Sequence, residues 1–231
     1  MNVKILRQQF PTSESYWETF FYDGPSDNSV AGLLEYLNYN DDITDITGKK
    51  TRRIAWDCSC LQGMFGACAM VINGIPALAC ETFLKDLKGN EIILRPLQKF
   101  PVIRDLMVDR SSIQENLKQS NIYIEDYRVS EDQGNKSRER EHLHQYTAAK
   151  CLECGLCLEV CPNYVDGSSF FGAIFANDCY LVYARNPEKE GQIKDHYARH
   201  FGSGCSKALS CMEVCPMKIP TLASMARLNR L

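Results

Sequence analysis

The chain has 231 residues, 12 of them cysteines, and a formal net charge of −3 at pH 7. This charge gives no reason to expect a nucleic-acid partner, and no stretch approaches the roughly 18 consecutive apolar residues of a membrane span. The cysteines form three groups rather than scattered pairs, and no apolar stretch of signal-peptide length begins the sequence. We therefore expect metal ligation in a reducing compartment rather than a disulfide framework, and one large or two modest domains.

The N-terminal stretch carries strand signals. Residues 3–9 alternate between apolar and polar side chains, and residues 16–22 are aromatic and β-prone. The residues expected to face inward from the first stretch are Val3, Ile5 and Leu6. Turn-forming residues between the two stretches predict a β-hairpin.

A helix is expected after this hairpin. Ser29 is placed to cap it, and four apolar residues that follow recur at helical spacing. They are Val30, Leu33, Leu34 and Leu37. Short strands at residues 69–72 and 92–94 follow, so residues 1–106 are predicted to form a small α+β unit.

The first cysteine group lies inside this unit. A plant-type [2Fe–2S] loop has the spacing C-x₄-C-x₂-C with a distant fourth cysteine. Aligned on Cys68, the first ligand is Cys60 and the distant one is Cys80. Gly63 and Gly66 allow the loop to turn its amides toward sulfide, because glycine has no Cβ to clash.

The second ligand position of this loop is Phe65, and a phenyl ring cannot bind iron. Three explanations are open. Cys58 substitutes after a shift of the loop, or the cluster keeps three cysteines with water or Asp57, or the cluster is lost. We expect a retained cluster with Cys58 as the candidate fourth ligand, because the other ligand positions and the glycines are present.

Beyond residue 106 the strand signals stop and helical ones dominate. Residues 113–117 and 173–184 are expected to be helical, whereas the charged stretch 130–140 is expected to be an exposed loop. A second, all-helical domain is therefore predicted at residues 107–231.

The second cysteine group is a run of the bacterial-ferredoxin form C-x₂-C-x₂-C-x₃-C-P. Its cysteines are Cys151, Cys154, Cys157 and Cys161, and Pro162 ends the run. In this pattern three thiolates surround one corner of a cuboidal cluster, and the fourth points to a second cluster. The full run is far more specific than one C-x₂-C pair, which zinc sites and redox motifs share.

The third cysteine group repeats this run near the C-terminus with one ligand missing. Cys205, Cys211 and Cys215 match the first, third and fourth cysteines. The second position holds Ala208, which cannot ligate iron. The sequence therefore contains an internal repeat with seven thiols rather than eight.

Two such runs exchange their fourth cysteines in ferredoxins. Exchange here gives a set of four thiolates, which suits a [4Fe–4S] cluster, and a set of three, which suits a [3Fe–4S] cluster. The set of four is Cys151, Cys154, Cys157 and Cys215. The set of three is Cys161, Cys205 and Cys211. A pair of structural zinc sites fits this division poorly, because each would need four ligands.

Together, these motifs resemble the iron–sulfur subunit of the succinate dehydrogenase/fumarate reductase family over residues 1–231. The resemblance rests on the first cysteine group, on both C-terminal runs with the gap at Ala208, and on shorter stretches at 66–74, 78–80 and 96–106. It implies a β-grasp plant-type ferredoxin domain followed by an all-α, bacterial-ferredoxin-like domain that holds two clusters.

The resemblance also implies a function. The chain would be an electron-transfer subunit with three clusters and no substrate site of its own. A flavoprotein subunit with FAD and a membrane-anchor subunit of the cytochrome b type, with quinone or haem, would be its partners. They would hold it at the cytoplasmic side of the bacterial inner membrane. The segments that meet quinone in some members differ here, at residues 162–166 and Ser206. The alternatives are a heterodisulfide-reductase-like electron carrier and a zinc-stabilised scaffold.

Other residues are expected to have structural or solvent-facing roles. Cys179 lies outside the three groups and is expected to be a small buried hydrophobe. Trp17 and the aromatics around it are expected in the core. Solvent-facing histidines are expected at His142, His144, His196 and His200. A solvated basic face, or one toward an acidic flavoprotein, is expected from Lys4, Arg7, Lys49, Lys50, Arg52 and Arg53.

Overall fold

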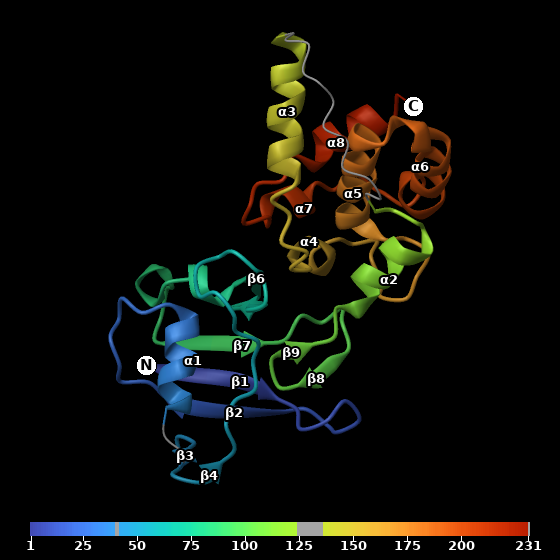
Figure 1. The fold of residues 1–231 in the computed structure, drawn as a ribbon. Helices are drawn as coiled ribbons and strands as arrows, with labels where there is room; N and C mark the ends of the chain where they lie inside the picture. Colours follow the sequence, from blue (N-terminus) through green and yellow to red (C-terminus); the bar gives the residue numbers. More distant parts are fainter. Residues whose placement is uncertain (40–41, 124–135, 231) are drawn as a thin grey trace. The chain divides into compact units, whose positions relative to one another are not determined.

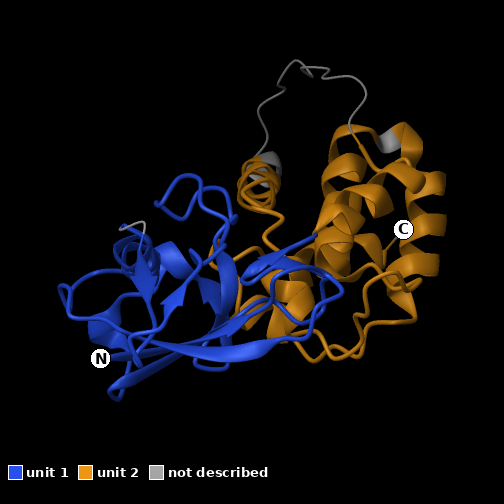
Figure 2. Cartoon of the chain, turned by 90° about the horizontal axis from the view of Figure 1, so that it is seen from below, with its two compact units in different colours: residues 1–109 blue, residues 110–231 orange. Residues whose placement is uncertain are grey.

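The structure is a computed structural model that describes residues 1–39, 42–123 and 136–230. The chain divides into two compact units, Met1–Asp109 and Arg110–Leu231, which Figure 2 distinguishes by colour. In the described ranges, every strand lies in the first unit, and all α-helices except α1 lie in the second. The predicted mixture of helix and strand is therefore confirmed.

The first unit is built on a five-stranded sheet with strand order β2-β1-β7-β5-β6 (Figure 1). Its strands are β1 (Asn2–Arg7), β2 (Tyr16–Phe21), β5 (Ala69–Ile72), β6 (Ile75–Leu78) and β7 (Glu91–Arg95). β1 pairs antiparallel with β2 and parallel with β7, while β5 pairs antiparallel with β6 and β7. The predicted hairpin and the strands near residues 69–72 and 92–94 are confirmed, whereas β6 was not predicted.

Two small ladders accompany this sheet. β3 (Ile43–Thr44) pairs with β4 (Lys50–Thr51), and β8 (Val102–Arg104) pairs with β9 (Met107–Val108). β9 lies beyond residue 106, so the expectation that the strands end at that residue is wrong, because one two-residue strand follows it. Its partner β8 precedes it closely in sequence, and two-residue strands leave no alternation to recognise.

The helix expected after the hairpin is α1 (Val30–Asn38). The backbone N–H of Gly32 donates to Ser29 Oγ at 3.2 Å, so Ser29 is the predicted N-cap. Leu33 and Leu34 are fully buried, as are Val3 and Ile5 of β1. Burying each such side chain contributes about 1.5–3 kcal/mol, so this inward face holds the unit together.

Two sequence expectations for the hairpin are wrong. Arg7 is not solvent-facing but has 0% exposure, because Glu18 and Asp105 supply buried carboxylates beside it. Trp17 is 46% exposed rather than in the core. Successive side chains of a strand point to opposite faces, and of the aromatics on β2 only Phe20, on the inner face, is fully buried.

The second unit is helical in its described part. Its α-helices are α2 (Ser111–Gln119), α3 (Lys136–Ala148), α4 (Leu156–Glu159), α5 (Gly172–Arg185), α6 (Glu190–Tyr197), α7 (Ser210–Glu213) and α8 (Thr221–Leu228). α2 and α5 confirm the helices predicted at 113–117 and 173–184. The loop expected at 130–140 is helical from Lys136 onward, and its residues 130–135 lie outside the described residues.

α5 lies in the core of this unit. Phe175, Ala176, Cys179 and Tyr180 on this helix are buried in one cluster with residues of α6 and α8. Cys179 has 0% exposure, so its prediction as a small buried hydrophobe is confirmed. No helix in the described residues is long and apolar enough to cross a membrane.

The histidine prediction holds for one of the four residues. His142 is exposed. His144 instead stacks edge-on against Tyr180 with ring centroids 4.6 Å apart, and the His200 ring lies parallel to that of Phe171 at 4.1 Å. His196 is also half-buried. Aromatic neighbours on other elements explain the difference, because they cover rings that the local sequence leaves exposed.

Candidate iron–sulfur centres

The two C-terminal cysteine runs follow the same backbone path. In the first run Glu153 and Gly155 have positive φ angles of 49° and 84°, and α4 follows directly. In the second run Lys207 and Leu209 stand at the equivalent positions with φ angles of 58° and 62°, and α7 follows directly. The internal repeat read from the cysteine spacing is therefore also a repeat of loop and helix.

The hydrogen bonds repeat as well. The backbone N–H of Leu158 donates to the Gly155 carbonyl at 3.0 Å, and that of Met212 donates to the Leu209 carbonyl at 2.9 Å. A left-handed backbone at a residue other than glycine costs about 1–2 kcal/mol. Leu209 adopts this unfavourable conformation, and strained backbone of this kind is often found at functional sites.

Cysteines of both runs line one cavity in the second unit. Its thiols come from Cys151, Cys154 and Cys157 of the first run and from Cys211 and Cys215 of the second. Mostly apolar residues complete the lining, among them Leu156, Ile174 and Ile219, together with the polar side chains of Asn177 and Thr221. The fold thus brings Cys215 to the three leading cysteines of the other run.

Burial disfavours ionisation of the three cysteines that the first run supplies to this cavity. Burial raises the pKa of Cys151 to about 12, and it also raises the pKa values of Cys154 and Cys157. A buried thiolate needs nearby positive charge, because removal from water disfavours its charged form. A set of buried soft thiols therefore fits an iron–sulfur cluster, whose irons supply that charge.

The second predicted set of thiols consists of Cys161, Cys205 and Cys211, of which Cys211 also lines the cavity. The pKa of Cys211 is raised by burial first and then by the charges of Cys161 and Cys205, so Cys211 lies within electrostatic range of each of these two thiols. The remaining position of this run is Ala208, which offers no donor. Within the described residues, no three His, Cys, Asp or Glu side chains are grouped as for a single metal ion, His196 and His200 included.

In the first unit, backbone N–H groups point at two of the thiols. Met64 N–H donates to Cys60 Sγ at 3.2 Å, and Gly63 N–H donates to Cys80 Sγ at 3.3 Å. The pKa of Cys60 is lowered by N–H bonds from Gln62 and Met64. Gly63 has a φ of 67°, and a Cβ there would lie 2.9 Å from the Glu81 side chain. Hydrogen bonds to sulfur of this kind are one means of setting a cluster potential.

The other predicted residues of this loop differ in exposure. Cys68 and Cys80 are buried with their sulfurs 3.4 Å apart. Phe65 is 64% exposed. Cys58 is exposed too, and its pKa is raised by partial desolvation of the thiol, then by the charges of Glu35, Cys68 and Cys60. Cys58 therefore lies close enough to two predicted ligands for their charges to interact.

Comparison with known proteins identifies the family. Residues 2–115 match the 2Fe-2S iron-sulfur cluster binding domain. The chain is 33% identical over 231 residues to the succinate dehydrogenase iron-sulfur subunit of Bacillus subtilis (strain 168), covering 98% of this chain and 90% of that protein. The chain belongs to the iron–sulfur subunit family of succinate dehydrogenase and fumarate reductase. The predicted family is confirmed, and the protein is an iron–sulfur electron-transfer subunit of this oxidoreductase family.

Two further relatives agree with this family. The fumarate reductase iron-sulfur subunit of Escherichia coli O6:H1 is 28% identical over 229 residues, covering 97% of this chain and 89% of its own. Among solved structures, a chain of the Mycobacterium smegmatis Sdh1 complex in the apo form superposes with a TM-score of 0.75 at 21% identity, covering 99% of this chain and 95% of that one. At this identity the likeness shows the fold, which extends over both units.

One feature of the cysteine cavity was missed by the sequence analysis. Asn177 lines the cavity, and neither its Oδ1 nor Oδ2 of the adjacent Asp178 has a hydrogen-bond partner, although both atoms are buried. Burial raises the pKa of Asp178 to about 8, and the charge of Glu153 adds to this. A polar pair inside a helix that is otherwise apolar was the available signal.

Replacing Asp178→Asn is expected to stabilise the fold. A carboxyl whose folded pKa lies above its ordinary value of about 3.9 lowers stability as pH rises from that value toward the folded one. The gain should be about 1–3 kcal/mol near pH 8, the range for a buried unsatisfied group. Thermal unfolding of both proteins at pH 4, 6 and 8 checks this. A gain that did not grow with pH would contradict the expected ionisation of Asp178.

Proposed function

We propose that this chain relays single electrons through three clusters between the FAD of a flavoprotein subunit and the quinone or haem of a membrane-anchor subunit of cytochrome b type. The observation with most weight is the repeated loop and helix around the two C-terminal cysteine runs, with a single thiol missing at Ala208. The proposed site is the cytoplasmic side of the bacterial inner membrane, where the partner subunits hold the chain.

The proposed ligands follow the groups described above. The [4Fe–4S] cluster would bind Cys151, Cys154, Cys157 and Cys215. The [3Fe–4S] cluster would bind Cys161, Cys205 and Cys211. The [2Fe–2S] cluster would bind Cys60, Cys68 and Cys80, with Cys58 as candidate fourth ligand, in a β-grasp domain.

The clusters supply one-electron redox chemistry, and the protein sets how readily each accepts an electron. Amide N–H groups of Met64 and Gly63 donate to thiol sulfur in the first unit, which favours the more negative reduced state. The mostly apolar lining of the cavity in the second unit lowers the local dielectric around its thiols. The proposed ligand sets and the groups around them therefore support an electron relay that has no substrate site of its own.

Metal analysis with partner capture tests this proposal. The chain, tagged and expressed in its own complex, is expected to yield about nine iron atoms with acid-labile sulfide. It should co-purify with a flavin-containing subunit and a membrane fraction. Zinc without sulfide would favour the scaffold, whereas iron and sulfide with a partner that lacks flavin would favour the heterodisulfide-reductase-like carrier.

A further inference from the structure

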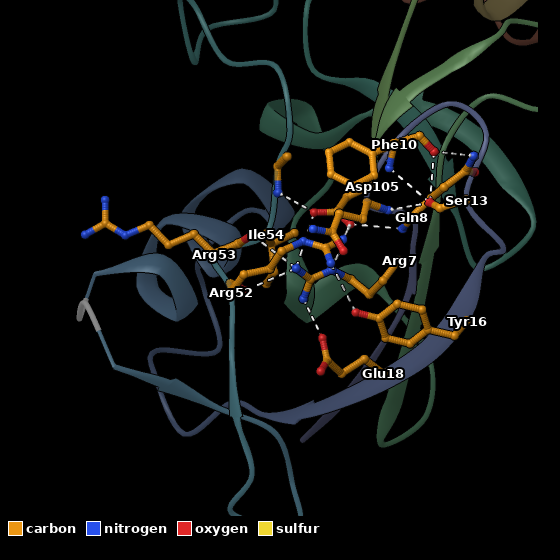
Figure 3. A network of polar contacts seen from close by, with 12 residues as sticks. Arg7, Gln8, Phe10, Ser13, Tyr16, Glu18, Arg52, Arg53, Ile54 and Asp105 are labelled. Carbon is orange, nitrogen blue, oxygen red and sulfur yellow. Dashed lines mark hydrogen bonds and ion pairs between the residues drawn. The ribbon is translucent and has the colours of Figure 1, made fainter.

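A largely buried ion network joins Arg7 of β1 to Glu18 of β2 and to Asp105 (Figure 3). Arg7 and Asp105 both have 0% exposure, and Arg7 Nε donates to Asp105 Oδ1 at 3.0 Å. Arg7 Nη1 donates to Glu18 on β2 at 2.5 Å. Burial raises the pKa of Asp105, but hydrogen bonds from Arg7 and Ala55 outweigh it and hold that pKa below its ordinary value. The network therefore favours the ionised form of the Asp105 carboxyl group.

The network fastens a segment that has no place in the sheet. Residues 52–55 lie outside the strands, yet Arg7 Nη2 donates to the carbonyls of Arg52 at 3.0 Å and Arg53 at 3.1 Å. Asp105 Oδ2 accepts from the Ala55 N–H at 2.9 Å. The Arg52 side chain closes the network by donating to Asp105 Oδ1 at 2.6 Å. Arg7 and Asp105 thus bond to this segment along its length.

This segment leads directly into the cysteine loop. Cys58 and Cys60 follow Ala55 closely in sequence, in irregular backbone that forms no strand. The other end of the loop is fixed differently, because Cys68 runs into β5, which pairs with β7. The start of the loop is held by Arg7 and Asp105, by a pair of 2.9 Å bonds between the Asn38 side chain and the Ile54 backbone, and by a 3.0 Å bond from the Leu106 N–H to the Ala55 carbonyl.

We propose that Arg7 and Asp105 are positioning residues for the [2Fe–2S] cluster, which hold residues 52–55 so that Cys58 and Cys60 face Cys68 and Cys80. This inference rests on the proposed function for the cluster itself. With Phe65 in place of a cysteine, the loop lacks one thiol between Cys60 and Cys68, so the position of its start has more influence on ligand geometry. Asp105 and Arg7 need not touch the cluster to act in this way.

The network offers a matched pair of variants. Asp105→Asn removes the charge that anchors Arg7, Arg52 and Ala55. Asparagine accepts the left-handed backbone of residue 105, whose φ is 49°, as readily as aspartate does. Glu18→Gln removes a charge from the same Arg7, and the contact it weakens is the one between Arg7 Nη1 and Glu18 on β2. Both variants therefore lose an ion pair with Arg7. Asp105→Asn also weakens the direct contacts that Asp105 makes with residues 52–55.

The experiment uses the assembled complex and follows loss of each cluster to a chelator by EPR. Asp105→Asn should lose its [2Fe–2S] signal about tenfold faster than the unchanged protein, the usual effect of losing an outer-shell contact. The clusters of the second unit should decay at their normal rate, and Glu18→Gln should leave the [2Fe–2S] rate within about twofold. Equal rates for Asp105→Asn and the unchanged protein, or equal acceleration by both variants, would overturn the proposal.

A second readout separates this inference from the proposed function. Amide hydrogen exchange at residues 55–64 should become faster in Asp105→Asn and stay unchanged in Glu18→Gln, with or without iron. If the unchanged protein held no [2Fe–2S] cluster, the proposed function would fail. The exchange rates at residues 55–64 would still test whether Arg7 and Asp105 position the loop. If Asp105→Asn does not fold, Arg52→Gln replaces it, because Arg52 is 27% exposed and loses only the outer bond. Unchanged exchange in that variant would reject the inference.

Discussion

Replacing Ala208→Cys is expected to remove the [3Fe–4S] EPR signal of the oxidised protein, by about tenfold or more, and to add iron to that cluster. Ala208 stands at the position of Cys154 in the repeated run. Lys207 and Leu209 on either side have the same left-handed backbone as Glu153 and Gly155. A thiol at position 208 would therefore leave the chain in the direction that Cys154 takes and supply the fourth ligand.

Ala208→Ser is the matched control, since it adds a side chain of similar size without a thiolate. It should keep the oxidised [3Fe–4S] signal. Iron content and the EPR of oxidised and reduced complexes measure the change. The ligand division proposed above is wrong if Ala208→Cys retains the full signal, or if the unchanged protein shows a second [4Fe–4S] cluster and no [3Fe–4S] signal.

Replacing Cys58→Ala is expected to reduce the [2Fe–2S] signal of the reduced protein about tenfold, because the loop would keep only three cysteine ligands. The added change Phe65→Cys should restore it by placing a thiol at the usual position of the loop. Phe65 is 64% exposed, and exposed substitutions usually change stability by less than about 0.5 kcal/mol. Restoration would therefore report ligation rather than a better-packed fold.

Cys179→Ala controls for the general effect of losing a thiol. Cys179 is fully buried in the helical core and belongs to none of the three groups, so its removal should lower stability without changing any cluster signal. EPR of the four proteins, with iron and sulfide content, gives the comparison. A [2Fe–2S] signal unaffected by Cys58→Ala would favour three cysteines with water or Asp57 as the remaining ligand.

Local sequence predicted much of the chemistry. The cysteine spacings predicted the repeated loops, because ligation by neighbouring thiols is a matter of a few residues of backbone. Ser29 and the apolar residues after it predicted α1 for the same reason, since capping and helical periodicity are short-range. The strands of the hairpin also followed from local sequence, the first from its alternation and the second from its aromatic, β-prone residues. These features need no knowledge of distant parts of the chain.

Tertiary structure decided what depends on distant partners. Arg7 has a basic side chain that local sequence places in solvent, and it is buried because Asp105, 98 residues away, meets it. Trp17 is exposed because it lies on the opposite face of β2 from the buried Phe20, and the packing of the whole sheet decides which face is covered. Cys215 reaches the cavity of Cys151, Cys154 and Cys157 only through folding of the second unit. The sequence determined which residues have the right chemistry, while long-range packing decided which of them meet, because burial and charge pairing are properties of the whole fold.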